Sequence, residues 1–256
     1  VRPADVCTSD YDCTLEASLQ TQPAIRLGLR MVKGLSADSA RRIATARQHR
    51  AFVSTQDLVE RAGLDRRDLN ALAAADALRE LAGHRHRARW EVLGVEPPTP
   101  LLPQPRIAEA EPMLRAATEG EDIAADYNHL GLSLRRHPLA LLRALLREKG
   151  MWTAQELRSL GDGEWVVAAG VVITKQRPGS AKGVTFVTLE DETGHVNVIV
   201  WRKLAERQRK ILMGARLMGV RGKLQRQGEV LHLVAQHLED HTNLLGTLVT
   251  RSRDFH

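Results

Sequence analysis

The stretch Val184-Thr-Phe-Val-Thr-Leu-Glu-Asp-Glu-Thr-Gly-His-Val-Asn-Val-Ile-Val-Trp201 decides the fold of the second half of the sequence. Residues 184–189 and 196–201 are rich in β-branched and aromatic side chains, which favour strands. The polar residues 191–194 between them favour a tight turn. The pattern therefore predicts two antiparallel strands joined as a β-hairpin.

Further β runs lie on both sides of this hairpin. Residues 165–173 form a long run, with Gly170 inside it as at a bend or bulge. A charged, helix-compatible stretch follows the hairpin at 203–211, and the runs 217–224 and 229–235 flank a second turn. Three strands, a helix and two more strands are the element order of an OB-fold, a five-stranded barrel that binds oligonucleotides or oligosaccharides.

The first half of the sequence shows helical spacing with two short breaks. The break Lys33-Gly34-Leu35-Ser36 is followed by a helix, and Ser36 is expected to be its N-cap. A second break at Gly63 precedes another helix, for which Asp65 is the expected N-cap. A third short helix is expected around residues 77–81. The sequence thus predicts paired helical hairpins.

Proline separates the two halves. Five prolines between Val95 and Pro105 disfavour helix and sheet, so a stiff linker is expected there. Helical spacing then resumes, with Pro138 at a first helical position and an apolar row at Leu139, Leu142, Leu145 and Leu146. The predicted fold class is α+β. We expect a polar lead-in at 1–25, helical hairpins at 26–90, a Pro-rich linker at 91–120, a helical connector at 121–163, an OB-fold at 164–240 and a tail at 241–256.

Charge is unevenly distributed along the chain. Residues 26–89 hold fourteen basic and seven acidic residues, and residues 164–256 hold fourteen and nine. The segment 90–163 between them is mildly acidic. Two basic blocks on folded segments favour a polyanion partner, usually nucleic acid. An Arg-rich surface that only raises solubility remains the alternative on charge alone.

Composition excludes several classes of protein. A hydrophobic content of 43% is too high for a wholly disordered chain. No apolar run approaches the roughly 20 residues that span a bilayer. Cys7 and Cys13 have no second pair to complete a zinc site or a disulfide scaffold. We therefore expect a cytoplasmic protein without membrane contact.

The paired hairpins predict a site for duplex DNA. A tight turn containing Gly aims the first amides of the next helix outward, where the helix dipole favours a phosphate oxygen. Neighbouring arginines add charge, and such contacts read the DNA backbone rather than its base sequence. Hairpins packed only for stability are the alternative. The predicted duplex contacts are Lys33, Gly34, Leu35, Ser36, Arg41, Arg42, Gly63, Arg66 and Arg67.

The predicted barrel suggests a second site, for single-stranded DNA. Because Val187 and Leu189 are expected in the core, strand alternation places Phe186 on the other face, where it can stack on a base. A core position stays open as the alternative for Phe186 and for Trp201. Residues 171–228 hold twelve basic and four acidic residues. The predicted single-strand contacts are Lys175, Arg177, Lys182, Phe186, Trp201, Arg202, Arg221, Lys223 and Arg226.

Nothing in the sequence predicts an active site. The carboxylates Glu190-Asp191-Glu192 fall in the predicted hairpin turn, where a solvated turn is favoured over a metal site. His84-Arg85-His86 lacks the spacing and the third ligand of a zinc site. Neither a phosphate-binding glycine loop nor a serine nucleophile elbow occurs. We expect no catalytic residue, no metal and no cofactor in this chain.

Several motifs, taken in order, resemble one family. Arg26-Leu-Gly-Leu-Arg-Met-Val-Lys-Gly-Leu35 resembles the helix-hairpin-helix entry of bacterial C-family DNA polymerases, the DNA polymerase III alpha-subunit family. Asp126-Tyr-Asn-His-Leu-Gly-Leu-Ser-Leu-Arg-Arg-His-Pro-Leu139 and the ending Ser252-Arg-Asp-Phe-His256 are similar to its error-prone branch. Residues 184–194 are similar to the OB-fold hairpin of the family, and 1–25 to the tail of its fingers region. The resemblance covers nearly the whole chain.

The resemblance implies a parent enzyme, an ImuC-type error-prone polymerase that copies damaged DNA. It implies Mg²⁺ held by palm carboxylates that have no match in this chain, so the fragment alone should be inactive. It also implies ImuA- and ImuB-type proteins and the sliding clamp in a damage-induced mutagenesis system. By resemblance, the first hairpin binds duplex and the barrel meets the single-stranded template. Because the chain begins with Val1, we expect an excised piece, and its ending suggests the natural C-terminus.

Departures from the family pattern leave other functions open. Ser36 stands where many helix-hairpin-helix motifs have a second Gly, and Asp76 stands where family members often have Gly. A negative charge at Asp76 opposes phosphate. Motifs at Gln56 and Gln236 lack the aromatic pair that anchors a clamp-binding segment. A docking module for mutagenesis partners, suggested by the leucine row, and a tRNA-anticodon-type OB domain remain alternatives, although packing on a neighbouring domain also explains that row.

Overall fold

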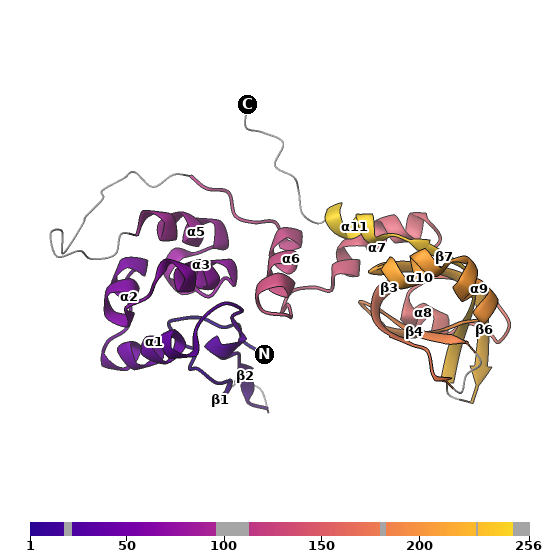
Figure 1. The fold of residues 1–256 in the computed structure, drawn as a ribbon, viewed down its shortest axis with the longest axis horizontal. Coiled ribbons are helices and arrows are strands. Elements are labelled where there is room, and N and C mark those ends of the chain that lie inside the picture. The colour runs from indigo at the N-terminus through magenta and orange to yellow at the C-terminus, as the bar shows by residue number, and fades with distance from the viewer. Residues whose placement is uncertain (18–21, 96–112, 180–182, 229, 248–256) are drawn as a thin grey trace. The chain divides into compact units, whose positions relative to one another are not determined.

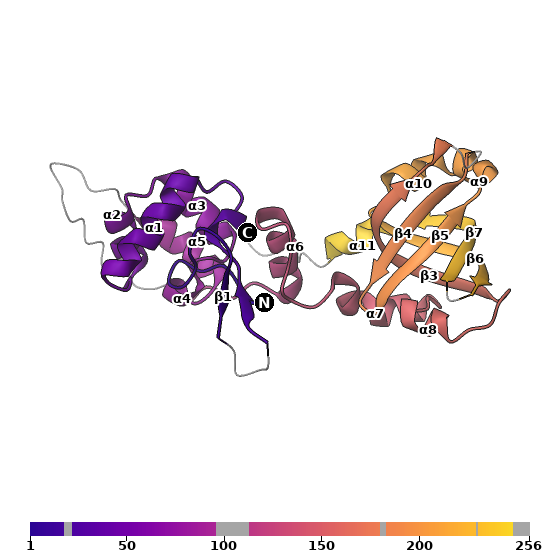
Figure 2. The same cartoon turned by 90° about the horizontal axis from the view of Figure 1, so that it is seen from below.

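The computed structural model of the chain describes residues 1–17, 22–95, 113–179, 183–228 and 230–247. By their contacts they divide into two compact units, Val1–Arg135 and Arg136–His256. Figures 1 and 2 show helices in the first unit, and strands with short helices in the second. The predicted Pro-rich stretch at 96–105 and the ending 252–256 lie outside the described residues.

Helices form most of the first unit. In chain order it contains the strands β1 (Thr14–Glu16) and β2 (Ala24–Arg26), the 3-10 turn η1 (Leu29–Met31), and the helices α1 (Ala37–His49), α2 (Thr55–Ala62), α3 (Arg66–Ala74), α4 (Arg79–Ala82), α5 (Arg85–Gly94) and α6 (Glu119–His129). The two strands pair as an antiparallel hairpin. One apolar core joins the helices, and its fully buried members include Leu29, Ile43, Leu58, Leu72 and Leu78.

The first residues of the chain belong to this core. Ala4 and Val6 are buried against the helices, which differs from the polar lead-in that we expected. Ser9 Oγ donates to the Leu27 carbonyl at 2.7 Å, and the Asp5 carboxylate accepts the Glu80 amide at 3.1 Å. This segment packs against the helices through single residues and not through a regular face, so its apolar residues show no helical or strand period. For this reason the sequence did not indicate that it is buried.

Both predicted helix starts are confirmed. Ser36 Oγ accepts the Ser39 amide at 3.0 Å, and Asp65 Oδ1 accepts the Asp68 amide at 2.8 Å. Each side chain therefore pairs one of the N–H groups that a helix leaves free at its start. Gly63 ends α2 with a φ of 59°, a left-handed conformation that glycine adopts without strain.

The turn before α4 holds a residue in a conformation that usually requires glycine. Asp76 has a φ of 61° and is the one non-glycine residue with positive φ in the described part of the chain. This conformation accounts for the Gly that the family pattern has there. The Asp76 carboxylate lies 3.2 Å from Arg79 and 3.3 Å from Arg135, so its charge is paired inside the unit.

Buried ion pairs attach α6 to the helical hairpins. The side chain of Arg85 is 3% exposed and contacts the carboxylates of Asp122 and Asp126 on α6. Arg135 adds a contact to Asp122 at 2.9 Å. A buried charge is tolerated only when it is paired, so these contacts fix α6 in place. The segment that we predicted as one connector at 121–163 is thus divided between the two units.

The second unit contains a closed five-stranded barrel, as the sequence predicts. Its strands are β3 (Trp165–Gln176), β4 (Thr185–Asp191), β5 (Gly194–Val200), β6 (Leu217–Gln227) and β7 (Val230–Asp240), in the spatial order β3-β4-β5-β7-β6. β5 pairs with β7 in parallel, and the other adjacent pairs are antiparallel. Closing the sheet removes its edges, and the predicted α+β class with an OB-fold is confirmed.

Gly170 permits a close approach between two strands. A Cβ atom at this position would lie 2.7 Å from the Leu189 Cβ on β4, which only glycine avoids. The predicted irregularity lies slightly further along β3, because its register with β4 shifts between Val172 and Thr174.

In the described part of this unit, the barrel is accompanied by the helices α7 (Pro138–Glu148), α8 (Ala154–Arg158), α9 (Arg202–Arg207), α10 (Arg209–Gly214) and α11 (Thr242–Thr247). Leu139, Leu142 and Leu146 of α7 are buried against Ala169 and Leu217 on the outside of the barrel. The packing interpretation of the leucine row is therefore confirmed for these three residues. None of the helices among the described residues has the length and apolar character needed to span a membrane.

The turn between β4 and β5 is not solvated, which corrects our prediction. Asp191 is 4% exposed, and its Oδ1 atom accepts the amides of Thr193 and Gly194 at 2.7 and 3.0 Å. Its Oδ2 atom accepts the Ala154 amide of α8 at 2.7 Å. The carboxylate is buried because it joins the turn to a helix start, where a negative charge is favoured.

Candidate nucleic-acid interface

The two predicted hairpin turns meet at one surface depression of the first unit, with a volume of about 550 Å³. Six of the predicted duplex contacts line it: Gly34, Leu35, Ser36 and Arg42 from the first turn and its helix, and Gly63 and Arg67 from the second. The sequence spacing of the two breaks thus brings both turns to the same surface.

Carboxylates also line this depression, and they are engaged in contacts inside the unit. Asp68 accepts the Ser36 amide at 3.3 Å and contacts the Ser39 hydroxyl, while Asp65 caps α3. The Ser36 amide, which we predicted as a phosphate donor, is therefore paired with Asp68. The first-turn amides of α3, at Arg66 and Arg67, lack acceptors within the helix and remain donors for an anion.

Arg42 holds the end of a helix. Its Nε donates to the Ala62 carbonyl at 2.8 Å and its Nη2 to the Gly63 carbonyl at 3.1 Å, both at the C-terminal end of α2. Nη2 also donates to the Ser39 hydroxyl at 2.9 Å, which joins the two hairpins. The last carbonyls of a helix have no internal partner and carry partial negative charge, so a guanidinium is favoured there.

The side chains of two other predicted duplex contacts also donate to carbonyls at helix ends. Arg66 contacts the Val92 carbonyl at the end of α5. Lys33 Nζ donates to the Tyr127 carbonyl at 3.1 Å, at the end of α6. These side chains have structural partners that the sequence did not reveal, and a role in DNA binding stays a prediction for them.

Arg41 and Arg67 lie at the surface. Arg41 is 3.4 Å from Asp38, and its guanidinium lies 4.6 Å from the centre of the Tyr11 ring. Arg67 is exposed and makes no hydrogen bond or ion pair with the described residues. As the second residue of α3, it lies beside the unpaired amides of that helix, so cation and donors converge at one place.

Both predicted aromatic contacts of the barrel face outward. Phe186 is 39% exposed, whereas Val187 and Leu189 are each 1% exposed, so the predicted alternation of β4 is confirmed. Trp201 is 55% exposed, directly before α9. The core alternative is therefore wrong for both side chains, and both are accessible to a base.

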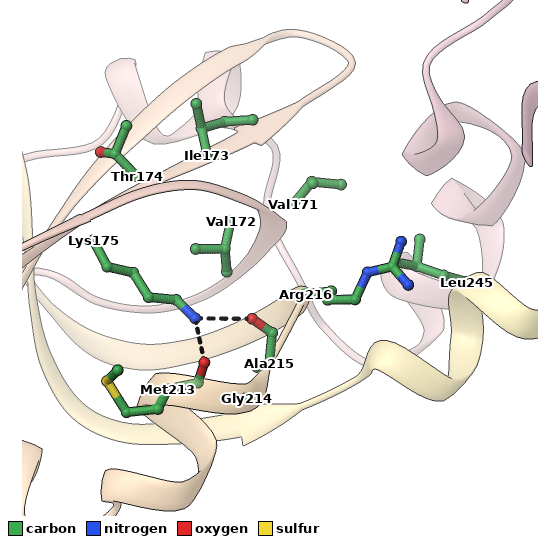
Figure 3. A pocket seen from close by; sticks show the side chains of 10 residues that line it. All are labelled: Val171, Val172, Ile173, Thr174, Lys175, Met213, Gly214, Ala215, Arg216 and Leu245. Atoms are coloured by element: carbon green, nitrogen blue, oxygen red, sulfur yellow. Dashed lines mark hydrogen bonds between the residues drawn. The ribbon is translucent and has the colours of Figure 1, made fainter. Parts of the chain in front are cut away.

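Lys175 and Arg226 of the barrel unit also cap helix ends. Lys175 Nζ donates to the carbonyls of Met213 and Ala215 at 2.9 and 3.3 Å, at the end of α10 (Figure 3). A pocket of about 390 Å³ lies at this point between β3 and α10. Arg226 donates to the Arg158 carbonyl at 2.9 Å, at the end of α8.

The remaining predicted cations of the barrel are exposed, apart from Lys182, which lies outside the described residues. Arg202 pairs with Glu206 at 2.8 Å. The side chains of three others make no hydrogen bond or ion pair within the described part of the chain: Arg177, Arg221 and Lys223. Among the predicted contacts of the barrel that the structure describes, these three have side chains free to contact phosphate.

Sequence reasoning missed Trp165, the first residue of β3. It is 63% exposed and lies directly opposite Lys223 of β6 in the sheet register. In the structure Val166 and Ala168 are buried in the barrel, and alternation places Trp165 outside, but the continuous apolar run of the sequence gives no such alternation. We had interpreted residues 165–173 only as a continuous β run.

In the described part of the chain, one group of side chains has the residue types and the spacing of metal ligands: Asp5, Cys7 and Glu80. The Asp5 carboxylate already accepts the Cys7 and Glu80 amides at 2.9 and 3.1 Å. Burial raises the pKa of the Cys7 thiol to about 12, so the thiolate that binds metals is disfavoured. Backbone hydrogen bonds thus account for this cluster, and the absence of a metal or cofactor stays a prediction.

Comparison with known families supports both predicted domains. Residues 1–88 match the family described as helix-hairpin-helix motif, and residues 166–240 match the family of OB-fold nucleic acid binding domains. These boundaries follow the helical hairpins and the barrel. The match of the first family from residue 1 agrees with the packing of Ala4 and Val6 in the helical core.

Relatives align over the whole chain. An error-prone DNA polymerase of Alkalilimnicola ehrlichii is 54% identical over 256 residues, which are 100% of this chain and 25% of that protein. Error-prone DNA polymerases of Methylococcus capsulatus and Pseudomonas savastanoi pv. phaseolicola are 52% and 53% identical, over 26% and 25% of their lengths. The chain is homologous to the C-terminal quarter of error-prone DNA polymerases. It spans about a quarter of the length of these polymerases.

Among solved structures, this chain aligns with an asparaginyl-tRNA synthetase from Pyrococcus horikoshii that is complexed with asparaginyl-adenylate. The alignment covers 36% of this chain and 22% of the synthetase chain. The identity is 23% and the TM-score 0.31, which is too low to support a statement about fold or ligand. The homology to error-prone DNA polymerases therefore carries the comparison.

Proposed function

We propose that this chain holds DNA for an error-prone DNA polymerase, with duplex on the helical hairpins and single-stranded template on the barrel. Its task is to retain and position DNA. In this proposal, phosphoryl transfer and its Mg²⁺ belong to other parts of a parent polymerase. Those parts correspond to the three quarters of the related polymerases with which this chain does not align. Contacts to phosphate carry no base information, which suits an enzyme that follows any template sequence.

The observation that carries the proposal is that several predicted contacts are exposed cations whose side chains neither cap a helix end nor pair with a carboxylate of the described residues. Arg67 lies beside the free amides of α3 in the unit that matches the helix-hairpin-helix family. Arg177, Arg221 and Lys223 lie on the barrel that matches a nucleic-acid-binding family. Cations without internal partners, on two such folds of one chain, favour phosphate as the shared ligand.

Resemblance alone extends the proposal to protein partners. An ImuB-type accessory protein and the sliding clamp are the partners that we propose for the parent polymerase. The docking alternative loses the feature that suggested it, because Leu139, Leu142 and Leu146 pack on the barrel. DNA contact therefore explains more of the described surface than docking does.

Fluorescence anisotropy with labelled duplex and single-stranded DNA, at low and high salt, tests the proposal. Arg67→Glu should weaken duplex binding about tenfold and leave single-strand binding unchanged. Phe186→Ala should weaken single-strand binding roughly fivefold or more, the loss of one stacked base, and leave duplex binding unchanged. Lys33→Glu suits this test less well, because Lys33 also caps α6.

Arg89→Glu is the matched control for Arg67→Glu. Arg89 is exposed on α5, which does not line the depression, so the same charge change is made outside the depression. Duplex affinity should then fall far less than with Arg67→Glu. Binding that ignores a tenfold increase in salt, or no binding to either DNA at low salt, would overturn the proposal.

A further inference from the structure

A row of side chains runs across the outer surface of the barrel, in register from strand to strand. Sheet pairing places Trp165 of β3 opposite Lys223 of β6, and Lys223 opposite Val234 of β7. Val234 pairs with Ile199 of β5, and Ile199 with Phe186 of β4. Figure 2 shows β4, β5, β7 and β6 side by side in this order. We call these five residues the aromatic row.

The aromatic row faces outward along its whole length. The neighbours of its members in sequence belong to the barrel core, namely Val166, Val187, Val198, Leu224 and Leu233. Since successive side chains of a strand alternate between faces, the row lies on the solvent side. Its two ends are its most exposed apolar members, Trp165 at 63% and Phe186 at 39%.

A second row lies beside the first, two residues away along β4, β5, β6 and β7, and it continues from β4 to a residue near the other end of β3. Its members, paired in the same manner, are Gln225, His232, Asn197, Thr188 and Thr174. These are side chains with hydrogen-bond donors and acceptors and no carboxylate. The aromatic row likewise contains no acidic residue, and Lys223 within it makes no ion pair with the described residues.

We propose that the two rows form one continuous track for single-stranded DNA, with Trp165 as a second stacking platform at the end opposite Phe186. Lys223 then contacts a phosphate next to the base on Trp165. The inference rests on the proposed function and extends it, because single-strand contact passes from the β4 side across β7 and β6 to the first residue of β3.

The chemistry of the rows favours a nucleic acid over a protein. Aromatic rings stack on any base, a lysine contacts phosphate, and uncharged polar groups accompany the base edges. Four strand spacings of about 4.8 Å separate the ends, roughly 19 Å along the surface. That is the length of about six stacked nucleotides at 3.4 Å each. The value falls within the roughly 4–16 nucleotides that an OB-fold covers.

Binding of oligothymidylates of two lengths to the complete chain tests the track. One length is about four nucleotides, which reaches one platform, and the other is about sixteen, which reaches both. Trp165→Ala should weaken binding of the long oligonucleotide roughly fivefold or more and that of the short one by no more than about twofold. Trp165→Phe keeps an aromatic face and should restore most of the long-oligonucleotide affinity.

Trp152→Ala is the matched control, since Trp152 is also exposed in this unit, at 42%, and lies outside both rows. If Trp165→Ala binds the long oligonucleotide as well as Trp152→Ala does, the extended track is wrong. Phe186→Ala would still weaken binding in that case, which keeps the proposed function. A wild-type chain that binds neither length at low salt would instead overturn the proposed function itself.

Discussion

The helical unit and the outer sheet of the barrel use their basic residues differently. In the helical unit, Arg42 donates to carbonyls at the end of α2, Arg61 to the Arg50 carbonyl at the end of α1, and Arg66 at the end of α5. On the outer sheet of the barrel, the side chains of Arg221 and Lys223 make no hydrogen bond or ion pair with the described residues.

The difference follows from how helices and sheets pair their backbones. Each helix leaves its last four carbonyls without partners, whereas the ladders of a closed barrel pair theirs between strands. At two helix ends of the barrel unit, those of α8 and α10, Arg226 and Lys175 donate to carbonyls in the same manner. The positive charge of a helical segment therefore overestimates how many of its cations are free for nucleic acid.

Replacing Arg42 by Ala tests this comparison with the largest expected effect. The change removes hydrogen bonds to two carbonyls and to the Ser39 hydroxyl, and leaves those groups without their donor. Charge-assisted hydrogen bonds and unpaired acceptors together should cost about 2–3 kcal/mol of unfolding free energy. Thermal or urea unfolding, followed by circular dichroism, measures it.

Arg67→Ala is the matched control in the same unit. Because Arg67 has no partner among the described residues, its removal should change the stability by less than about 0.5 kcal/mol. Its effect should instead be seen in duplex affinity. Equal destabilisation by the two variants would contradict the division between capping and free arginines.

Local sequence signals predicted most of the fold. The caps Ser36 and Asp65, the Pro138 start of α7 and the alternation around Phe186 depend on neighbours within a few residues, and all are observed. The element order of the barrel followed from the same short-range patterns. The buried role of Asp191 did not, because its Ala154 partner lies on another element.

The candidate site was predicted only in part, for a related reason. The sequence placed Gly34 and Gly63 at turns, which meet in the structure, but Lys33 reaches Tyr127, which lies 94 residues away in the chain. No local pattern indicates which helix end a long cationic side chain will cap. Trp165 could not be assigned to a face, because residues 165–173 form a continuous apolar run without period-2 alternation.

Substitution of two lysines of the barrel tests the same comparison, between a cation that caps a helix and one that is free, with a smaller expected effect on stability. Lys175→Ala removes a cap of α10 and should lower the unfolding free energy by about 1–2 kcal/mol, without changing single-strand affinity. Lys223→Ala should leave the stability unchanged and weaken single-strand binding roughly fivefold. The slope of the logarithm of affinity against the logarithm of salt concentration should become smaller by about 1, the value expected for one lost phosphate contact.

These lysine variants are compared by unfolding and by anisotropy titrations at several salt concentrations. The comparison fails if Lys175→Ala weakens binding as much as Lys223→Ala while the protein remains folded. It also fails if Lys223→Ala lowers the unfolding temperature, because that result would give Lys223 an internal role like that of Lys175.

The smallest expected effect concerns pH and a carboxylate that supports the helical unit. Burial opposes the ionisation of Asp57, but the Val53 amide and the guanidinium of Arg61 outweigh it and hold the pKa of this carboxyl below its usual value. The folded state therefore releases the Asp57 proton more readily than the unfolded state does. Its contribution is present above the unfolded value of about 3.9 and is lost as the pH falls.

Asp57→Asn should consequently destabilise the chain by about 1 kcal/mol at pH 7 and by progressively less as the pH falls below about 4. Unfolding of both proteins at pH 7 and in acid gives the difference directly. Asp38→Asn is the control, since Asp38 lies 3.4 Å from Arg41 and both side chains are largely exposed. Exposed pairs contribute little, so its effect should be small at either pH. If the Asp57→Asn difference stayed constant from pH 7 into acid, the carboxylate would not act through its charge, and the helical unit would depend on neutral hydrogen bonds at that helix start.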